Sequence, residues 1–186
     1  ANAPRDPSVG PGPYLFTIST IEPRKNLGTL FAAFAALKRK DVRLVVAGGK
    51  GWLYESALAR IGELGIADRV DLLGYVADDR LPGLYGHAEA YVCPSLTEGF
   101  GMPVLEAMLA GTPVVSSDAG ALPEVGGNLV RYFSPTDAEG MARAIDDELA
   151  DEGRRSRAAK AKLRAAEFTW DRCADLTLDA IEEAIR

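Results

Sequence analysis

Two glutamates, Glu98 and Glu106, enclose a glycine-rich stretch within the segment PSLTEGFGMPVLE, residues 94–106. Gly99 and Gly101 let the backbone turn tightly and approach a ligand without a Cβ in the way. Glu98 belongs to the expected loop, and Glu106 lies about one turn into the helix that follows. The two carboxylates can therefore face one ligand from different sides, which predicts a binding site here.

The same segment predicts a helix N-terminus with free backbone amides. Pro103 suits the first turn of a helix, where a missing N–H costs nothing. The amides of Phe100, Gly101 and Met102 then point outward, and such groups bind anions or hydroxyls. In the alternative interpretation, the two glutamates only stabilise the helix dipole, by ~0.3–1 kcal/mol each. The glycines and the proline fix the loop as well, so we favour the ligand site.

A second group of candidates follows the first expected strand, in the segment EPRKN, residues 22–26. Arg24 and Lys25 are cations in a loop just before a helix N-terminus, where they would attract an anionic group of a ligand. For Arg24, a solvated pair with Glu22 is an equally good interpretation. Thr20 can hydrogen-bond a phosphate but cannot neutralise it.

Composition limits the class of protein. The 186 residues are 47% hydrophobic and 26% charged, which suits one domain or one and a half. The formal net charge of −6 argues against a nucleic-acid partner or an acidic membrane surface. Cys93 and Cys173 lie far apart, which supports no disulfide scaffold or zinc site and predicts a reducing, cytoplasmic location. The sequence has no D-x-D triplet, so we expect no metal site of that kind and no cofactor.

Short apolar runs alternate with amphipathic stretches from Tyr14 onward. Six strands that alternate with helices predict an α/β fold, a doubly wound parallel sheet covered on both faces. Ligands bind such sheets at the carboxyl ends of the strands. The expected strands are 14–19, 44–47, 70–73, 90–93, 113–116 and 129–133, and the expected helices are 27–37, 52–64, 79–85, 103–110, 138–150, 153–168 and 171–185.

Residues 1–13 carry four prolines and two glycines and little that can be buried. Such a composition is typical of a linker, so we expect an interdomain linker with an expression remnant at its start. Residues 14–186 are then one domain that includes the C-terminal helices. The chain is expected to be the second half of a longer protein.

The segment EGFGMPVLEAMLAGTPVV, residues 98–115, resembles the E-x7-E segment of retaining glycosyltransferases with the GT-B fold, family 4 in particular. The likeness extends to IEPRKN, LGYV, SDAGALPEVGG and FTWDRCADLTLDAI, in the family's order. It covers only the C-terminal, donor-binding half of such enzymes. The resemblance implies a Rossmann-like domain that binds a nucleotide sugar, with the acceptor domain missing.

Carried over by position, the resemblance makes Glu98 the catalytic glutamate beside the donor sugar and Glu106 the acceptor of hydrogen bonds from the ribose. Lys25 would bind the diphosphate, and the amides of residues 100–102 would meet phosphate and sugar oxygens. The backbone of Tyr75 and Val76 would help to hold the nucleobase.

One departure from the family concerns the end of the first strand. Many members have a Gly-Arg pair where this chain has Ser19-Thr20, which is similar to a subgroup of mannosyltransferases. This similarity favours GDP-mannose as the donor and makes phosphate binding depend more on Arg24 and Lys25. The family's histidine lies in the missing half, so His87 is not a candidate.

Two alternatives remain at this point: half of a GT-B-type sugar-nucleotide epimerase, or a regulatory nucleotide-binding domain without chemistry. In the favoured interpretation this chain alone binds the donor and transfers nothing, and any membrane association depends on the missing half. The last helix has an apolar stripe that by default faces the core: Cys173, Leu176, Ala180, Ile181 and Ala184. The resemblance implies instead that this helix packs on the N-terminal domain, so that part of the stripe is exposed where that domain is absent.

Overall fold

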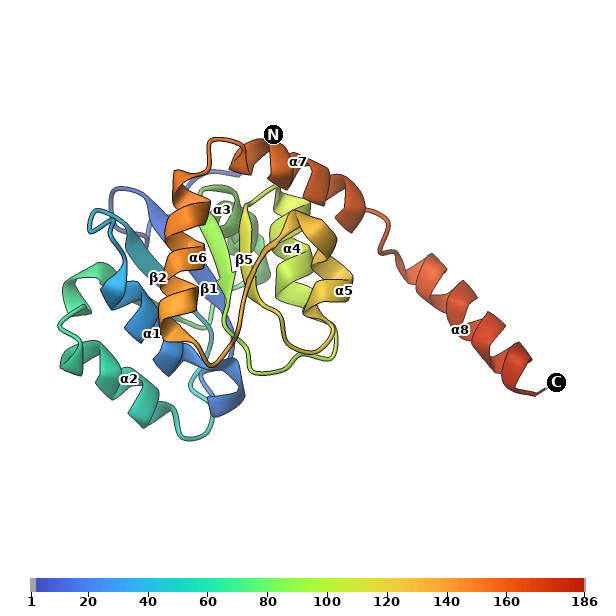
Figure 1. Ribbon diagram of the computed structural model, residues 1–186, viewed down its shortest axis with the longest axis horizontal. Helices are drawn as coiled ribbons and strands as arrows, with labels where there is room; N and C mark the ends of the chain where they lie inside the picture. Colours follow the sequence, from blue (N-terminus) through green and yellow to red (C-terminus); the bar gives the residue numbers. More distant parts are fainter. Residues whose placement is uncertain (1–2, 186) are drawn as a thin grey trace.

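The computed structural model describes residues 3–185, which form a six-stranded sheet between two layers of helices (Figure 1). All neighbouring strands are parallel, in the order β3-β2-β1-β4-β5-β6. The predicted α/β class, with a Rossmann-like doubly wound sheet, is confirmed. The strands are β1 (Tyr14–Ile18), β2 (Arg43–Ala47), β3 (Val70–Gly74), β4 (Ala90–Cys93), β5 (Val114–Ser117) and β6 (Arg131–Phe133).

The helices divide between two buried hydrophobic clusters, one on each face of the sheet. The first face carries α1 (Leu27–Ala36), α2 (Tyr54–Glu63) and α6 (Ala138–Ala150). The second carries α3 (Leu81–Gly86), α4 (Met102–Ala110), α5 (Leu122–Gly126) and α7 (Arg154–Ala165). The short 3₁₀ helices are η1 (Pro23–Lys25), η2 (Ala67–Arg69), η3 (Asp78–Arg80) and η4 (Gly127–Leu129).

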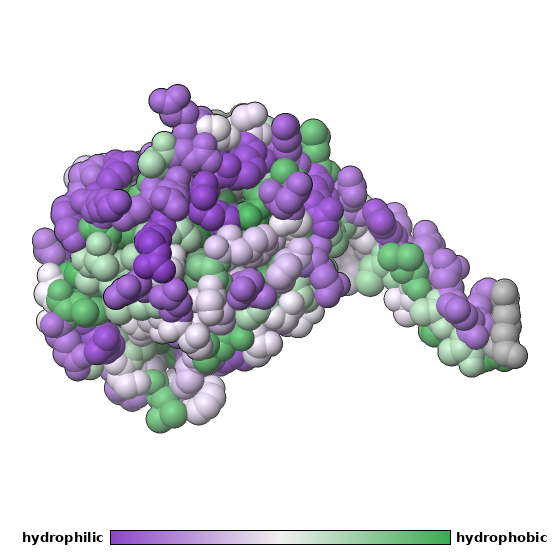
Figure 2. Space-filling model, in the orientation of Figure 1, coloured by the Kyte–Doolittle hydropathy of each residue, from purple (hydrophilic) through white to green (hydrophobic). Residues whose placement is uncertain are grey.

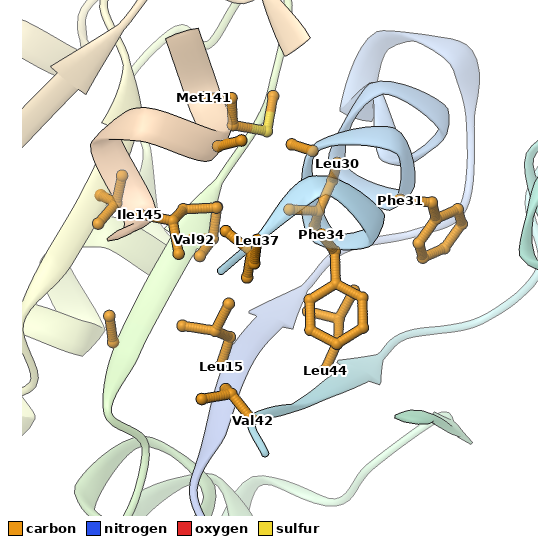
Figure 3. Close-up of a cluster of buried hydrophobic side chains, with 14 of the residues drawn as sticks. Leu15, Leu30, Phe31, Phe34, Leu37, Val42, Leu44, Val92, Met141 and Ile145 are labelled. Atoms are coloured by element: carbon orange, nitrogen blue, oxygen red, sulfur yellow. The ribbon is translucent and has the colours of Figure 1, made fainter. Parts of the chain in front are cut away.

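The core of the first face forms because each strand there is apolar on the side that α1 and α6 cover. Phe31 and Phe34 of α1 are fully buried against the sheet. Burial of side chains this large supplies most of the favourable free energy of folding. Figure 3 shows the other members that meet in this cluster: Leu15, Leu30, Leu37, Val42, Leu44, Val92, Met141 and Ile145.

The order of the strands fixes where a ligand can bind. The chain runs outward from β1 through β2 to β3, then returns and places β4 on the other side of β1. The connections after β1 and β4 leave the sheet in opposite directions, which opens a crevice at the carboxyl ends of these two strands. The loops at residues 19–26 and 94–101 border that crevice.

The helix α8 (Trp170–Ala184) does not take the place expected for it. It extends away from the sheet and its helices, and each of its residues is exposed (Figure 1). The default expectation that its apolar stripe faces the core is therefore wrong for this structure, whereas the exposed stripe expected in the absence of the N-terminal domain is observed. Figure 2 shows apolar side chains along α8, where Leu176, Leu178 and Ile181 are each more than half exposed.

The proline-rich segment before β1 lies against the domain. The carboxylate of Asp6 is buried and accepts hydrogen bonds of 2.7 and 2.8 Å from Arg80. The hydrogen bond from Arg80 holds the pKa of this carboxyl well below its usual range. The segment is thus anchored beside α3, while its assignment as an interdomain linker stays a prediction.

Candidate functional site

The cations after β1 and the first glutamate of the glycine-rich loop meet at the crevice. Lys25 Nζ lies 2.6 Å from Glu98 Oε1, and Arg24 Nη1 lies 3.1 Å from Glu98 Oε2. Arg24 also pairs with Glu22 at 3.0 Å, which was the alternative interpretation for this residue. The pair with Glu22 is thus present, while diphosphate binding by Arg24 stays a prediction. Glu98 is the common partner of the two cations.

Two loops that are far apart in sequence are joined here by polar contacts. The amide of Leu96 donates to the carbonyl of Arg24 at 2.8 Å. Asn26, whose φ of 56° places it in the left-handed region, donates from Nδ2 to the carbonyls of Pro94 and Pro135 at 3.0 and 2.8 Å. Asn26 precedes α1 as expected, but its side chain holds three loops together and does not cap the backbone of the helix.

Glu98 is an anion held among donors. Burial raises the pKa of its carboxyl, but hydrogen bonds from Lys25 and Ser95 and the charge of Arg24 outweigh burial and lower that pKa overall. The side chains of Glu98 and Lys25 are only 11% and 15% exposed, so this pair is largely shielded from water. The arrangement keeps Glu98 charged and fixed in position.

Glycines hold the loop between Glu98 and α4. Gly101 is the N-cap of α4 with a φ of +97°, and a Cβ there would lie 2.5 Å from Leu122 Cδ2. Gly120 has a φ of +59°, and a Cβ there would lie 2.4 Å from the carbonyl oxygen of Glu98. The loop after β5 therefore packs directly against Glu98 in a way that only glycine permits.

The amides predicted to bind anions are available. Within residues 3–185, the N–H groups of Phe100, Gly101 and Met102 donate no hydrogen bond to the protein. They belong to the first turn of α4 and the residues before it, where the helix dipole adds partial positive charge. These amides can donate hydrogen bonds to a phosphate or hydroxyl oxygen.

Glu106 stands apart from the ion-paired group. Its half-buried carboxylate accepts a hydrogen bond of 2.8 Å from the hydroxyl of Tyr85, at the end of α3. The sequence interpretation missed Tyr85, because nothing local marks a contact between residues 21 positions apart.

The remaining predicted residues follow β1 and β3. Thr20 is exposed in the loop after β1, with its methyl group against Gly51. Tyr75 is 80% exposed just beyond β3, whereas the side chain of Val76 is buried. Val76 can therefore offer a ligand only its backbone, and Tyr75 can offer its ring as well. His87 contacts the carbonyl of Ala3 and lies outside the candidate site.

An apolar groove of about 620 Å³ adjoins the loop where α4 begins. The rings of Phe100 and Phe168 meet edge to face in its wall, with their centroids 5.8 Å apart. The first residues of α8 form the other wall, including Trp170, which is 83% exposed. The groove is a further apolar surface beside the polar crevice.

Residues 3–185 contain no group of three histidine, cysteine or acidic side chains arranged to hold a metal ion. In the same range, no helix has the length and apolar character needed to cross a membrane. The fold and the crevice define a Rossmann-like domain with a polar site at the point where the strand order reverses.

The chain belongs to the family described as glycosyl transferases group 1, whose model matches residues 4–164. It is 38% identical over 172 residues to the O-antigen chain mannosyltransferase B of Escherichia coli. The aligned region covers 90% of this chain and 45% of that protein. The first relatives matched are thus more than twice as long as the aligned region.

Solved structures of similar fold also match most of this chain. A sucrose-phosphate synthase from Thermosynechococcus elongatus superposes with a TM-score of 0.81 and 27% identity, over 94% of this chain and 46% of that one. The separate C-terminal domain of a group 1 glycosyl transferase from Francisella tularensis matches with a TM-score of 0.74 and 25% identity, over 84% and 86% of the two chains. A similar domain therefore forms an ordered structure by itself.

Proposed function

We propose that this chain is the donor-binding domain of a retaining glycosyltransferase, which transfers a hexosyl group from a nucleoside-diphosphate sugar. The observation that carries the proposal is the contact of Lys25 and Arg24 with Glu98, in the same loop that ends in the free amides of the α4 N-terminus. Both groups suit a diphosphate, the first by charge and the second by hydrogen bonds.

The proposed roles divide along the crevice. Lys25, Arg24 and the amide of Gly101 stabilise the diphosphate as charge develops on the leaving oxygen. Glu106 accepts hydrogen bonds from the ribose hydroxyls, and the backbone of Val76 contacts the base beside the exposed Tyr75. In the retaining scheme the acceptor oxygen attacks the face from which the diphosphate leaves, and the departing phosphate oxygen takes its proton.

Glu98 is the proposed catalytic residue on the hexose side. Its carboxylate is fixed by Lys25, Arg24 and Ser95, and its charge is suited to accept hydroxyl hydrogens of the sugar or to stabilise positive charge at the anomeric carbon. We infer a metal-independent reaction, because the two cations supply the charge that a metal would otherwise contribute.

The relatives support a proposal for the identity of the donor. The Escherichia coli protein named above is described as a mannosyltransferase. Together with the Ser19-Thr20 sequence at the end of β1, this similarity favours GDP-mannose.

The acceptor is proposed to bind to a second domain that packs against α8 and the adjoining groove. The exposed apolar residues Trp170, Leu176 and Ile181 support this assignment, because isolated soluble domains rarely leave such a contiguous stripe in water. This chain alone is then expected to bind the donor without transferring the sugar.

Calorimetric titration with GDP, UDP, ADP and dTDP, each with and without EDTA, tests the proposal. Selective binding of GDP that EDTA leaves unchanged is the expected result. Binding of none of the four would overturn the assignment of a donor site to this domain. Binding that is insensitive to both Lys25→Ala and Glu106→Gln would favour the non-catalytic alternative.

A further inference from the structure

Tyr85 is enclosed on all sides except at its hydroxyl. The residue is 2% exposed, and its ring meets those of Phe16 and Tyr91 with centroid distances of 5.0 and 5.5 Å. Its backbone carbonyl accepts a hydrogen bond of 2.7 Å from Thr112 Oγ1. Ring and backbone are therefore held in place, which fixes the direction of the Cζ–Oη bond.

That direction leads to Glu106, where Tyr85 Oη donates to Oε2 at 2.8 Å. Within residues 3–185, Tyr85 is the only side chain that hydrogen-bonds or ion-pairs with Glu106. The contrast with Glu98 is clear, because two cations and Ser95 hold that carboxylate. Glu106 is oriented by one neutral donor.

Tyr85 is a donor under all ordinary conditions. Burial, and then the nearby Glu106 carboxylate, raise the pKa of the Tyr85 hydroxyl far above its usual value. Tyr85 thus retains its proton, and its hydrogen bond leaves Glu106 Oε1 without a partner among the described residues. A carboxylate oxygen oriented in this way accepts hydrogen bonds from a ligand hydroxyl without first having to be reoriented.

We propose that Tyr85 is a positioning residue that holds the Glu106 carboxylate in the orientation needed to recognise the ribose hydroxyls of the donor. This inference rests on the proposed function, since it assigns the ribose to Glu106. Tyr85 itself touches no ligand. It fixes the rotamer of Glu106, so its removal should weaken the preference for ribose over 2′-deoxyribose.

A matched control is present in the same hydrophobic cluster. Tyr14 is fully buried, and its hydroxyl donates to the carbonyl of Leu84 at 2.8 Å. Tyr14→Phe removes the same atom as Tyr85→Phe, from a similar apolar environment, without touching Glu106. A general effect of losing a buried hydroxyl would appear in both variants.

The experiment compares GDP with 2′-deoxy-GDP by calorimetric titration of wild type, Tyr85→Phe, Glu106→Gln, the double variant and Tyr14→Phe. If wild type prefers another base, the ribo and 2′-deoxy diphosphates of that base replace this pair. For Tyr85→Phe we expect affinity for the ribonucleotide to fall about fivefold, the usual effect of one hydrogen bond, and affinity for the deoxynucleotide to fall less than about twofold. Because the Gln side chain still accepts from Tyr85 but lacks the carboxylate charge, Tyr85→Phe should cost less affinity for the ribonucleotide in the Glu106→Gln background than in wild type.

The results distinguish a failure of the proposed function from a failure of the role proposed for Tyr85. Absence of binding by wild type overturns the proposed function, and the inference with it. Wild-type binding with equal losses of both nucleotides in Tyr85→Phe, or additive losses in the double variant, overturns the role of Tyr85 alone. Circular dichroism and thermal unfolding check that each variant folds.

Glu106→Asp provides a second test that leaves Tyr85 intact. It keeps a carboxylate but withdraws it from the tyrosine hydroxyl by one methylene. We expect it to lose the preference for ribose as Tyr85→Phe does, and a preference retained at the wild-type level would contradict the proposal.

Discussion

Replacing Glu98 by Gln should tighten the binding of a nucleoside diphosphate to this domain. Glu98 lies between Lys25 and Arg24 at 2.6 and 3.1 Å, so its negative charge offsets the attraction that these cations exert on a phosphate. The substitution Glu98→Gln removes that charge while retaining an amide oxygen that can accept a hydrogen bond from Lys25. The two cations would then be available to the ligand alone.

The magnitude follows from the geometry. A phosphate oxygen that contacts Lys25 on the side away from Glu98 lies about 5 Å from its carboxylate, about two hydrogen-bond lengths. Two unit charges at that distance repel by about 0.8 kcal/mol in water and about 3 kcal/mol at an effective dielectric constant near 20. Because both side chains keep some contact with solvent, we expect about 1–2 kcal/mol, or about 5- to 30-fold tighter binding.

Calorimetry with GDP, and with guanosine as a comparison, measures this effect. The diphosphate should bind Glu98→Gln more tightly, and the bare nucleoside should bind both proteins equally. Glu22→Gln is the matched control, because Glu22 pairs only with Arg24, which is more exposed than Lys25, and should change affinity less. Weaker binding of GDP to Glu98→Gln would refute the reasoning, since it would mean that Glu98 mainly holds the cations in place.

Four further predictions concern affinity and stability. Lys25→Ala should weaken GDP binding by ~1.5–3 kcal/mol in calorimetry and leave guanosine unchanged; equal losses of both would make Lys25 structural. The pKa of the Glu98 carboxyl is lowered in the folded protein, so its ion pairs stabilise the fold fully above its pKa in the unfolded chain, near 4.3. This stabilisation is lost as the pH falls through the pKa in the folded state. The difference in unfolding free energy between wild type and Glu98→Gln, measured in urea, should therefore shrink below about pH 4. Phe34→Ala, which empties a fully buried site beneath the Arg69 guanidinium, should cost ~3–5 kcal/mol in urea unfolding, and a cost under about 1 kcal/mol would contradict the assignment of the core. Gly120→Ala should weaken GDP binding at least about tenfold in calorimetry by pushing the Glu98 carbonyl away, and unchanged affinity would show that this contact can shift at no cost.

The fold could be predicted because its signals are local. Alternating apolar runs and amphipathic stretches predicted six strands, and the bounds of β4 and α6 match the prediction residue for residue. At the last strand a local turn explains the difference in bounds: residue 129 was expected in that strand, but residues 127–129 form η4, and β6 begins only at Arg131. The expectation for α8 failed because an amphipathic pattern shows that a helix has an apolar face but not what covers it.

The site could be predicted in part, for a topological reason. Once the sheet is parallel, the loops after β1 and β4 must meet at one edge, which brings Lys25 near Glu98. Their direct ion pair, and the contact between Tyr85 and Glu106, depend on side-chain geometry between distant segments. No spacing in the sequence encodes such contacts.

The pairing of Glu98 with Lys25 and Arg24 has an electrostatic reason. The same reason explains why Lys25→Ala is expected to weaken GDP binding and Glu98→Gln to tighten it. A cation such as Lys25, whose side chain is only 15% exposed, is costly unless an anion accompanies it. Glu98 is that anion. Its negative charge holds the two cations in place and also weakens their attraction for a phosphate. Lys25→Ala removes the attraction, whereas Glu98→Gln removes the competitor. If both variants weakened GDP binding to the same degree, the pair would act as one structural unit, and Glu98 would not compete with phosphate for the cations.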